Sequence, residues 1–129
     1  MDAMHFLPHV PQPECPAGAL AAAAFIASGA RGMERGPVPM DRDEQDRDVP
    51  ADLELLRLAV PRRVYTVSHY KYVADRLHWL YQHRDLIGGL SFIEEPPVLR
   101  FFAGLMAPTK SNWGAALVEA FEKDFGTEC

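Results

Sequence analysis

The sequence predicts an α/β (α+β) fold in which helices pack on one mixed or antiparallel sheet to form a two-layer sandwich. Three segments carry helix start and stop signals, and short apolar runs typical of strands lie between them. The chain has 129 residues, of which 48% are hydrophobic and 24% are charged, a composition typical of one globular domain. Its net charge of -5 argues against a nucleic-acid-binding domain, which normally carries an excess of basic residues.

An alanine-rich helix is expected over residues 17–30, after an irregular, proline-containing arm. Pro16 suits the first helical turn, where the N–H that proline lacks would have no partner. Gly29 and Gly32 are candidate helix ends. The apolar run is shorter than the about 20 residues that span a bilayer, and no secretory signal is visible. We therefore expect a cytoplasmic protein that does not contact a membrane.

Two strands are expected on either side of an acidic loop. Residues 32–38 form the first, and residues 40–52 form a solvated loop because acidic side chains greatly outnumber basic ones there. Residues 53–60 are rich in branched apolar side chains and end at Pro61, which is typical of a buried strand. Alternation along this strand places Arg57 on the same face as two of the leucines. We therefore expect a buried arginine that needs a carboxylate or several other acceptors.

A second helix is expected after Thr66, a good N-cap, and it continues to about residue 84. Gly88 and Gly89 follow it and favour its termination. Apolar side chains recur on one face of this helix at three- and four-residue spacing: Tyr70, Val73, Leu77 and Leu80.

The last third of the chain predicts two more strands and a third helix. Residues 90–93 and 98–102 are typical of strands, joined by a turn over residues 94–97. Ser111 is the expected N-cap of the helix, and Gly126 follows its end. One face of this helix is apolar: Trp113, Leu117, Ala120 and Phe121.

Short motifs add little to this interpretation. The sequence has no glycine-rich phosphate loop followed by Lys-Ser or Lys-Thr, and no Gly-x-Ser-x-Gly turn. His5, His9 and Cys15 could be assembled into a zinc site, but prolines interrupt a regular helix there and no fourth ligand is near in the sequence. We therefore expect no metal site. Patterns alone indicate an α/β domain with one unexplained buried arginine.

Three longer segments resemble a known enzyme family. They are Ala30-Arg-Gly-Met-Glu-Arg-Gly36, the run from Leu53 to Thr66, and the run from Phe92 to Phe102. All three are similar to the carboxyl-terminal, small domain of the β-eliminating lyases, the tyrosine phenol-lyases and tryptophanases, within the fold-type I pyridoxal-phosphate (PLP) enzymes. The resemblance runs from about residue 2 to about residue 107. Its Met-Glu-Arg-Gly motif is similar to the version found in tyrosine phenol-lyase.

The resemblance implies substrate-binding roles for four residues. In the family, the arginine matching Arg57 binds the substrate α-carboxylate, and the one matching Arg35 helps to select the phenolic ring. The phenylalanines matching Phe101 and Phe102 lie against the aromatic ring of the substrate. A carboxylate would give Arg57 the two-point partner that a buried guanidinium needs. Two alternatives stay open: Arg57 in a structural ion pair, and the two phenylalanines as core residues.

The resemblance also implies that the cofactor is held elsewhere. In the family, the Schiff-base lysine, the aspartate facing the pyridine nitrogen and the phosphate-binding loop all belong to a large domain upstream of the matched segments. None of Lys71, Lys110 and Lys123 matches the Schiff-base position. We therefore expect no cofactor-binding, metal-binding or catalytic residue on this chain alone, although Arg35 could act on the leaving group.

These expectations divide the chain into a lyase-like domain, residues 1–108, and a C-terminal helical extension, residues 109–129. The favoured hypothesis is a small subunit of a split PLP-dependent β-eliminating lyase, inactive alone and completed by a separately encoded, PLP-binding large subunit in a hetero-oligomer. Its substrate would be an amino acid, aromatic by the resemblance. The alternative is a non-catalytic, lyase-derived domain that binds an amino acid or a protein partner as a regulator.

Overall fold

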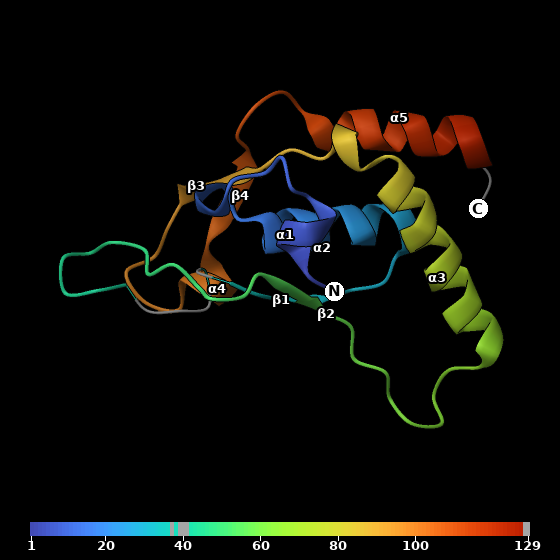
Figure 1. The fold of residues 1–129 in the computed structure, drawn as a ribbon, viewed down its shortest axis with the longest axis horizontal. Coiled ribbons are helices and arrows are strands. Elements are labelled where there is room, and N and C mark those ends of the chain that lie inside the picture. The colour runs from blue at the N-terminus through green and yellow to red at the C-terminus, as the bar shows by residue number, and fades with distance from the viewer. Residues whose placement is uncertain (37, 39–41, 128–129) are drawn as a thin grey trace.

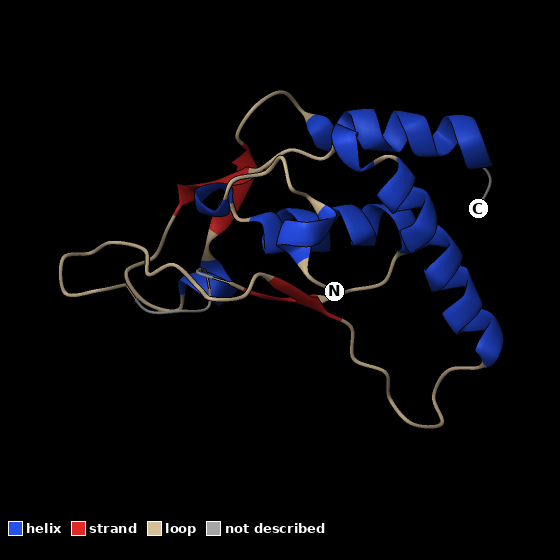
Figure 2. Ribbon diagram, in the orientation of Figure 1, coloured by secondary structure: helices blue, strands red, loops and turns tan. Residues whose placement is uncertain are grey.

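The computed structural model describes residues 1–36, 38 and 42–127, and it shows a small α+β fold (Figure 2). The helices are α1 (Ala3–Phe6), α2 (Pro16–Ser28), α3 (Val67–Gln82), α4 (Arg100–Ala103) and α5 (Trp113–Phe125), with short 3-10 helices at Gln12–Glu14 and Arg84–Leu86. The strands are β1 (Met33–Arg35), β2 (Leu55–Arg57), β3 (Leu90–Glu94) and β4 (Leu105–Pro108). The mixed helix-and-strand class agrees with the prediction.

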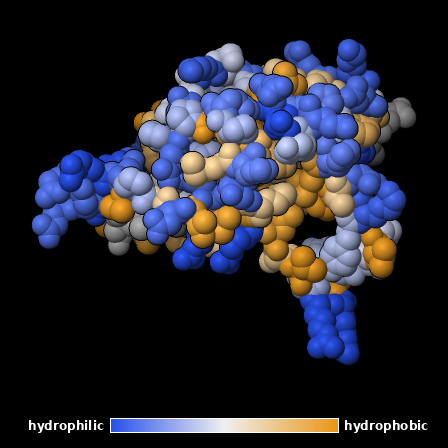
Figure 3. All heavy atoms as spheres, viewed as in Figure 1, coloured by the Kyte–Doolittle hydropathy of each residue, from blue (hydrophilic) through white to orange (hydrophobic). Residues whose placement is uncertain are grey.

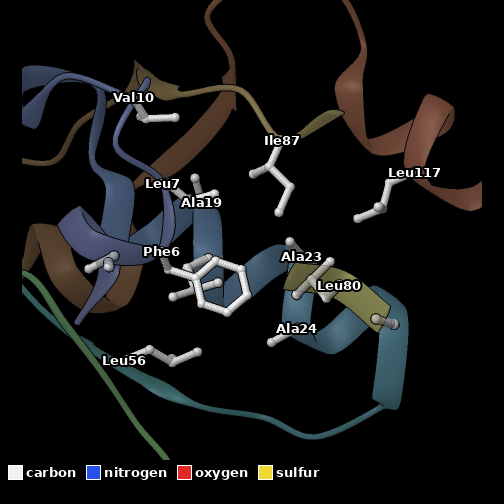
Figure 4. Close-up of a cluster of buried hydrophobic side chains, with 14 of the residues drawn as sticks. Phe6, Leu7, Val10, Ala19, Ala23, Ala24, Leu56, Leu80, Ile87 and Leu117 are labelled. Carbon is white, nitrogen blue, oxygen red and sulfur yellow. The ribbon is translucent and has the colours of Figure 1, made fainter. Parts of the chain in front are cut away.

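Helix α2 forms the centre of the molecule, where α1, α3, α5 and the β1–β2 pair contact it (Figure 1). Pro16 occupies the first turn as predicted, and of the two candidate helix ends it is Gly29 that closes the helix, with a φ of 69°. Because most of its side chains are methyl groups, neighbours can pack closely on several sides of it at once. The buried cluster around it includes Leu7, Leu56 and Leu80 (Figure 4).

The N-terminal segment contains a short helix and contributes to the core, so the prediction of an irregular arm is wrong. Asp2 caps α1 by accepting hydrogen bonds from the amides of Met4 and His5. Phe6 and Leu7 are buried. The prolines that suggested an irregular arm lie after α1 or within the first 3-10 helix, where they interrupt no α-helical hydrogen bond.

The strands form two separate antiparallel pairs, β1–β2 and β3–β4, rather than the single predicted sheet. Strand β2 covers only three residues of the strand predicted over residues 53–60. The strand predicted over residues 98–102 is wrong, because these residues lead into α4 and the partner of β3 is β4. Leu99 has a left-handed φ of 57°, which interrupts extended backbone at this point.

Helix α3 begins as predicted, with Thr66 as its N-cap. Thr66 and His69 form a capping box in which the Thr66 amide donates to Nδ1 of His69 at 3.2 Å. The predicted apolar stripe is deeply buried only near its C-terminal end, since Leu80 is inaccessible to solvent whereas Tyr70 is 39% exposed. The first turns of α3 project from the body of the molecule (Figure 1).

Helix α5 packs against α2 through the predicted apolar face. Its N-cap is Asn112 rather than Ser111, and the Asn112 side chain accepts a hydrogen bond from the Ala115 amide at 3.3 Å. Trp113 and Leu117 are buried, and Nε1 of Trp113 donates to a backbone carbonyl of the segment before β3 at 3.1 Å. These contacts make α5 part of the core.

The acidic segment has no helix or strand over residues 42–52, as predicted, while Met40 and Asp41 lie outside the described residues. Arginine–carboxylate pairs connect this segment to the residues around the start of α4. Among the described residues, every helix is too short or too polar to span a lipid bilayer.

Candidate functional site

The two arginines of the predicted site lie on the same face of the β1–β2 pair. The register places Arg35 opposite Leu55, and Met33 opposite Arg57. Residues directly opposite each other share a face of a sheet, as do residues two apart on one strand. Arg35 and Arg57 are therefore diagonal neighbours on one face, and both are exposed.

The prediction that Arg57 is buried is wrong. The other face of β2 is the inner one: Leu56 is fully buried, and Glu54, just before the strand, is 1% exposed. The Glu54 carboxylate tolerates burial because it accepts a hydrogen bond from the Ala17 amide at 3.3 Å, at the positive N-terminal end of α2. Alternation thus identified which residues share a face but not which face points inward.

Neither arginine forms an ion pair with any residue that the structure describes. Nη2 of Arg57 donates a weak hydrogen bond to Sδ of Met33 at 3.9 Å. A structural ion pair, one of the two alternatives for Arg57, is therefore not formed within the described part of the chain. The face that carries Arg35 and Arg57 can accept an anion from outside the molecule.

Phe101 and Phe102 lie in α4 and contact each other edge to face, with ring centroids 4.9 Å apart. Phe102 is 79% exposed, so it is not a core residue in this chain, whereas Phe101 is half-buried. Both rings line a hollow of about 500 Å³ together with residues 95–100. Neither of the two arginines lines this hollow, so the structure brings the phenylalanines together but does not place the arginines with them.

An arginine–carboxylate network lies beside this pair of rings. Nη1 of Arg100 donates to Asp48 at 2.5 Å and to Glu95 at 3.1 Å. Nη2 of Arg42 donates to Glu95 at 2.6 Å. Although burial alone would raise it, the hydrogen bonds and charges of Arg100 and Arg42 lower the pKa of Asp48. These hydrogen bonds and ion pairs connect the acidic segment to the residues that lead into α4.

An acidic cluster missed by the sequence analysis lies beneath the arginine face. Burial, and to a smaller extent the charge of Glu54, raises the pKa of Glu34 to about 7. Burial and the charges of these glutamates raise the pKa of the Cys15 thiol to about 12, which keeps it neutral and weakly reactive. Alternation along β1 could have indicated this cluster. Glu34 points to the opposite face of the strand from Arg35, and the residues that share its face are Gly32 and Gly36.

The described lysines are poorly suited to a Schiff base with PLP. A Schiff-base lysine requires an amine removed from water. Lys71 has a side chain that is 72% exposed and pairs with Asp75 at 2.5 Å, and Lys110 and Lys123 are exposed. Residues 1–36, 38 and 42–127 also contain no group of three or more His, Cys, Asp or Glu side chains suited to a metal ion. No step through a cofactor is therefore assigned to this chain.

Comparison with known proteins gives a consistent set of relatives, although no protein-family model matches the sequence. Tyrosine phenol-lyase of Pasteurella multocida is 48% identical over 109 residues, which cover 84% of this chain and 24% of the relative. Tyrosine phenol-lyase of Intrasporangium calvum is 47% identical over 119 residues, which cover 92% of this chain and 25% of the relative. Tryptophanase of Salinibacter ruber is 44% identical over 108 residues, which cover 84% of this chain and 23% of the relative.

The chain spans about a quarter of the length of these relatives. Identity at this level over most of the chain confirms the resemblance inferred from the three sequence segments. The chain is therefore homologous to one segment of tyrosine phenol-lyase and tryptophanase.

Proposed function

We propose that this chain supplies the substrate-binding surface of a split PLP-dependent β-eliminating lyase, whose large subunit is a separate polypeptide that holds the cofactor. Homology to tyrosine phenol-lyase and tryptophanase supports the relation to lyases. The observation that carries the proposal is the outward pair of Arg35 and Arg57, two cations on one face of the β1–β2 pair. The complex is placed in the cytoplasm, where the buried thiol of Cys15 would stay reduced.

Arg57 is proposed to bind the α-carboxylate of an amino acid. A guanidinium presents two parallel donors that match the two oxygens of a carboxylate. An exposed pair of this kind contributes little because water competes for both partners. A large subunit that covers the β1–β2 face would exclude this water and strengthen the pair. Amino-acid binding is therefore expected in the complex and not in the chain alone.

Arg35 and the two phenylalanines are proposed to select the side chain of the substrate. Arg35 can donate to a phenolic oxygen, and the exposed ring of Phe102 offers an edge or face to an aromatic ring. When bound to the large subunit, PLP supplies the electron sink for loss of the α-proton and departure of the β-substituent. The proposal requires that α4 and the β1–β2 face border one cleft once the large subunit is in place.

The loop between β2 and α3 is a candidate contact for the large subunit. It projects from the body of the molecule, with a hydrophilic tip and apolar side chains at its base (Figure 3). Val60, Val64 and Val67 are 63%, 61% and 81% exposed. A hollow of about 750 Å³ lies between this loop, α3 and the end of α2, and most of its lining is apolar or aromatic, including Tyr65 and Tyr70. Exposed apolar surface of this kind is typical of protein interfaces.

Co-expression of the chain with a candidate large subunit tests the proposal. We expect a stable complex that shows the visible absorbance of bound PLP and releases ammonia and a keto acid from L-tyrosine or a related amino acid. The chain alone is expected to be inactive. Val67→Asp should weaken the complex, whereas Val118→Asp, which changes an exposed side chain on α5, is the matched control and should not.

Failure to form a complex, together with no turnover of aromatic or thiol amino acids, would contradict the split-enzyme proposal. Calorimetric titration of the isolated chain with free amino acids distinguishes this proposal from the alternative, a non-catalytic domain that binds an amino acid as a regulator. Binding by the chain alone, unaffected by the large subunit, would support the non-catalytic regulator instead.

A further inference from the structure

Two glutamates lie on the inner side of the β1–β2 pair, beneath the arginine face. Glu34 is the middle residue of β1, next to Arg35, and Glu54 immediately precedes β2. Oε2 of Glu54 accepts a hydrogen bond from the Ala17 amide in the first turn of α2. Both carboxyl groups therefore lie between the strands that carry the arginines and the helix at the centre of the fold.

Two glycines leave the space that these carboxyl groups occupy. A β-carbon on Gly18, in the first turn of α2, would lie 2.5 Å from Oε2 of Glu34. A β-carbon on Gly36, just after β1, would lie 2.5 Å from Oε2 of Glu54. Non-bonded atoms do not approach this closely, so a larger residue at either position would displace a carboxyl group. The positions of the two carboxyl groups therefore depend on glycine at residues 18 and 36.

We propose that Glu54, which is buried, and Glu34, which is partly buried, form a carboxyl pair that positions the β1–β2 pair on the N-terminus of α2 and carries at most one negative charge below neutral pH. Because the same strands carry Arg35 and Arg57, the pair also holds these two arginines in position for substrate binding, and this consequence rests on the proposed function. The packing of the β1–β2 pair against α2 does not depend on that function.

The surroundings of the two carboxyl groups favour this distribution of charge. Burial raises the pKa of Glu54 as well, but the Ala17 amide and the positive end of α2 act in the opposite direction and favour a charge on Glu54 rather than on Glu34. Its Oε1 is buried without a hydrogen-bond partner among the described residues, so this site already holds one poorly compensated charge. A second charge on Glu34 would add repulsion to the cost of burial, which is why the pKa of Glu34 rises to about 7.

The other groups near this pair do not change that conclusion. Burial raises the pKa of the Cys15 thiol to about 12, so it stays neutral at ordinary pH. Asp48 and Arg100 act on this thiol with opposite signs. On the side of β3, the neighbour of the Gly18 position is the apolar side chain of Leu90. Burial also raises the pKa of Glu54, so both carboxyl groups make stability fall as pH rises. Glu34, whose pKa rises to about 7, is the group expected to respond near neutral pH.

The folding stability of the chain is expected to fall as pH rises. Because the pKa of Glu34 is higher in the folded chain than in the unfolded one, its contribution is complete below its ordinary pKa and is lost as pH rises through about 7. The ratio of folded to unfolded chain should fall on the order of 100-fold between about pH 5 and about pH 8.5. Urea unfolding of the full chain measures this ratio without a partner or cofactor.

Three variants identify the responsible groups. Glu34→Gln keeps the shape of the side chain without its titration, so it should remove most of the pH dependence and exceed wild type in stability above about pH 8. Glu54→Gln removes the neighbouring charge and should move the remaining loss to lower pH. Glu44→Gln, in the exposed acidic segment, is the matched control and should keep the wild-type profile.

Hydrogen exchange gives a local measure of how the strands are held. After correction for intrinsic exchange rates, amide protection in β1 and β2 should fall above neutral pH more than protection in α5. This difference should be absent in Glu34→Gln. If the carboxyl group contributed only to overall stability, amide protection would change in the same proportion in all helices and strands.

A flat wild-type stability profile would overturn the proposal, as would a Glu34→Gln profile as steep as that of Glu44→Gln. If Glu34→Gln does not fold, NMR titration of the ¹³C-labelled carboxyl groups in the wild-type chain decides the matter. One glutamate titrating near neutral pH supports the pair, and titration of every glutamate below about pH 5.5 contradicts it. An inactive complex with the expected pH profile would count against the proposed function alone.

Discussion

Nη1 of Arg100 donates a hydrogen bond to the Asp48 carboxylate at 2.5 Å, joining residues 52 positions apart in the sequence. Arg100 also pairs with Glu95 at 3.1 Å, and its side chain is only 11% exposed. It is the first residue of α4 and immediately precedes Phe101. The acidic segment and the helix that carries the phenylalanines are thus fastened to each other.

Asp48→Asn is expected to lower the free energy of unfolding by about 0.5–1 kcal/mol, a small value because water screens the half-exposed carboxylate. Since the pKa of Asp48 is lowered in the fold, the contribution is present near neutral pH and is lost as pH falls below the ordinary range of aspartate. Urea unfolding at low and high salt measures it, and the difference should shrink in high salt. Asp52→Asn is the control; an equal effect in both variants would show that the pair with Arg100 contributes nothing.

Phe102→Ala is expected to change the free energy of unfolding by less than about 0.5 kcal/mol, because the ring is 79% exposed. Phe101→Ala should cost about 1 kcal/mol or more, since that ring is half-buried. In a reconstituted complex, Phe102→Ala should reduce kcat/KM for aromatic amino acids more than for thiol amino acids. A large loss of stability in Phe102→Ala would instead assign this ring to the core.

Leu117→Ala is expected to destabilise the chain by about 2–5 kcal/mol, because the side chain is fully buried between α5 and α2. Val118→Ala, on the next residue and 40% exposed, should cost less than about 1 kcal/mol. Urea or thermal unfolding compares the two. Small and similar effects would show that α5 is dispensable for the core.

The three long helices, α2, α3 and α5, were predictable because their ends depend on nearby residues, whereas the four-residue helices α1 and α4 were not predicted. Pro16 and Gly29 bound α2, and Thr66 with His69 caps α3, all within one turn of the helix concerned. The strands were harder to predict because a strand needs a partner that lies far away in the sequence. Apolar residues 98–102 resemble a strand, yet the backbone turns at Leu99 and β3 pairs with a later segment.

The candidate site could be predicted only in part. Similarity to the lyases indicated Arg35 and Arg57, and their roles stay predictions. That they share a face depends on the β1–β2 register, which spacing along one strand does not contain. The exposure of Arg57 and the burial of Glu54 depend on α2, whose N-terminus stabilises a carboxylate that hydropathy alone would place in water.

The carboxylate-binding role of Arg57 is tested most directly by steady-state kinetics of the reconstituted complex with Arg57 variants. Arg57→Ala should lower kcat/KM about 10- to 100-fold, since a hydrogen bond to a charged group contributes about 1.5–3 kcal/mol. Arg57→Lys should recover only part of this loss because an ammonium lacks the two-point geometry. Arg47→Ala, at an exposed arginine in the acidic segment, should retain wild-type activity. An active complex in which Arg57→Ala keeps the wild-type kcat/KM would contradict the role assigned to this arginine.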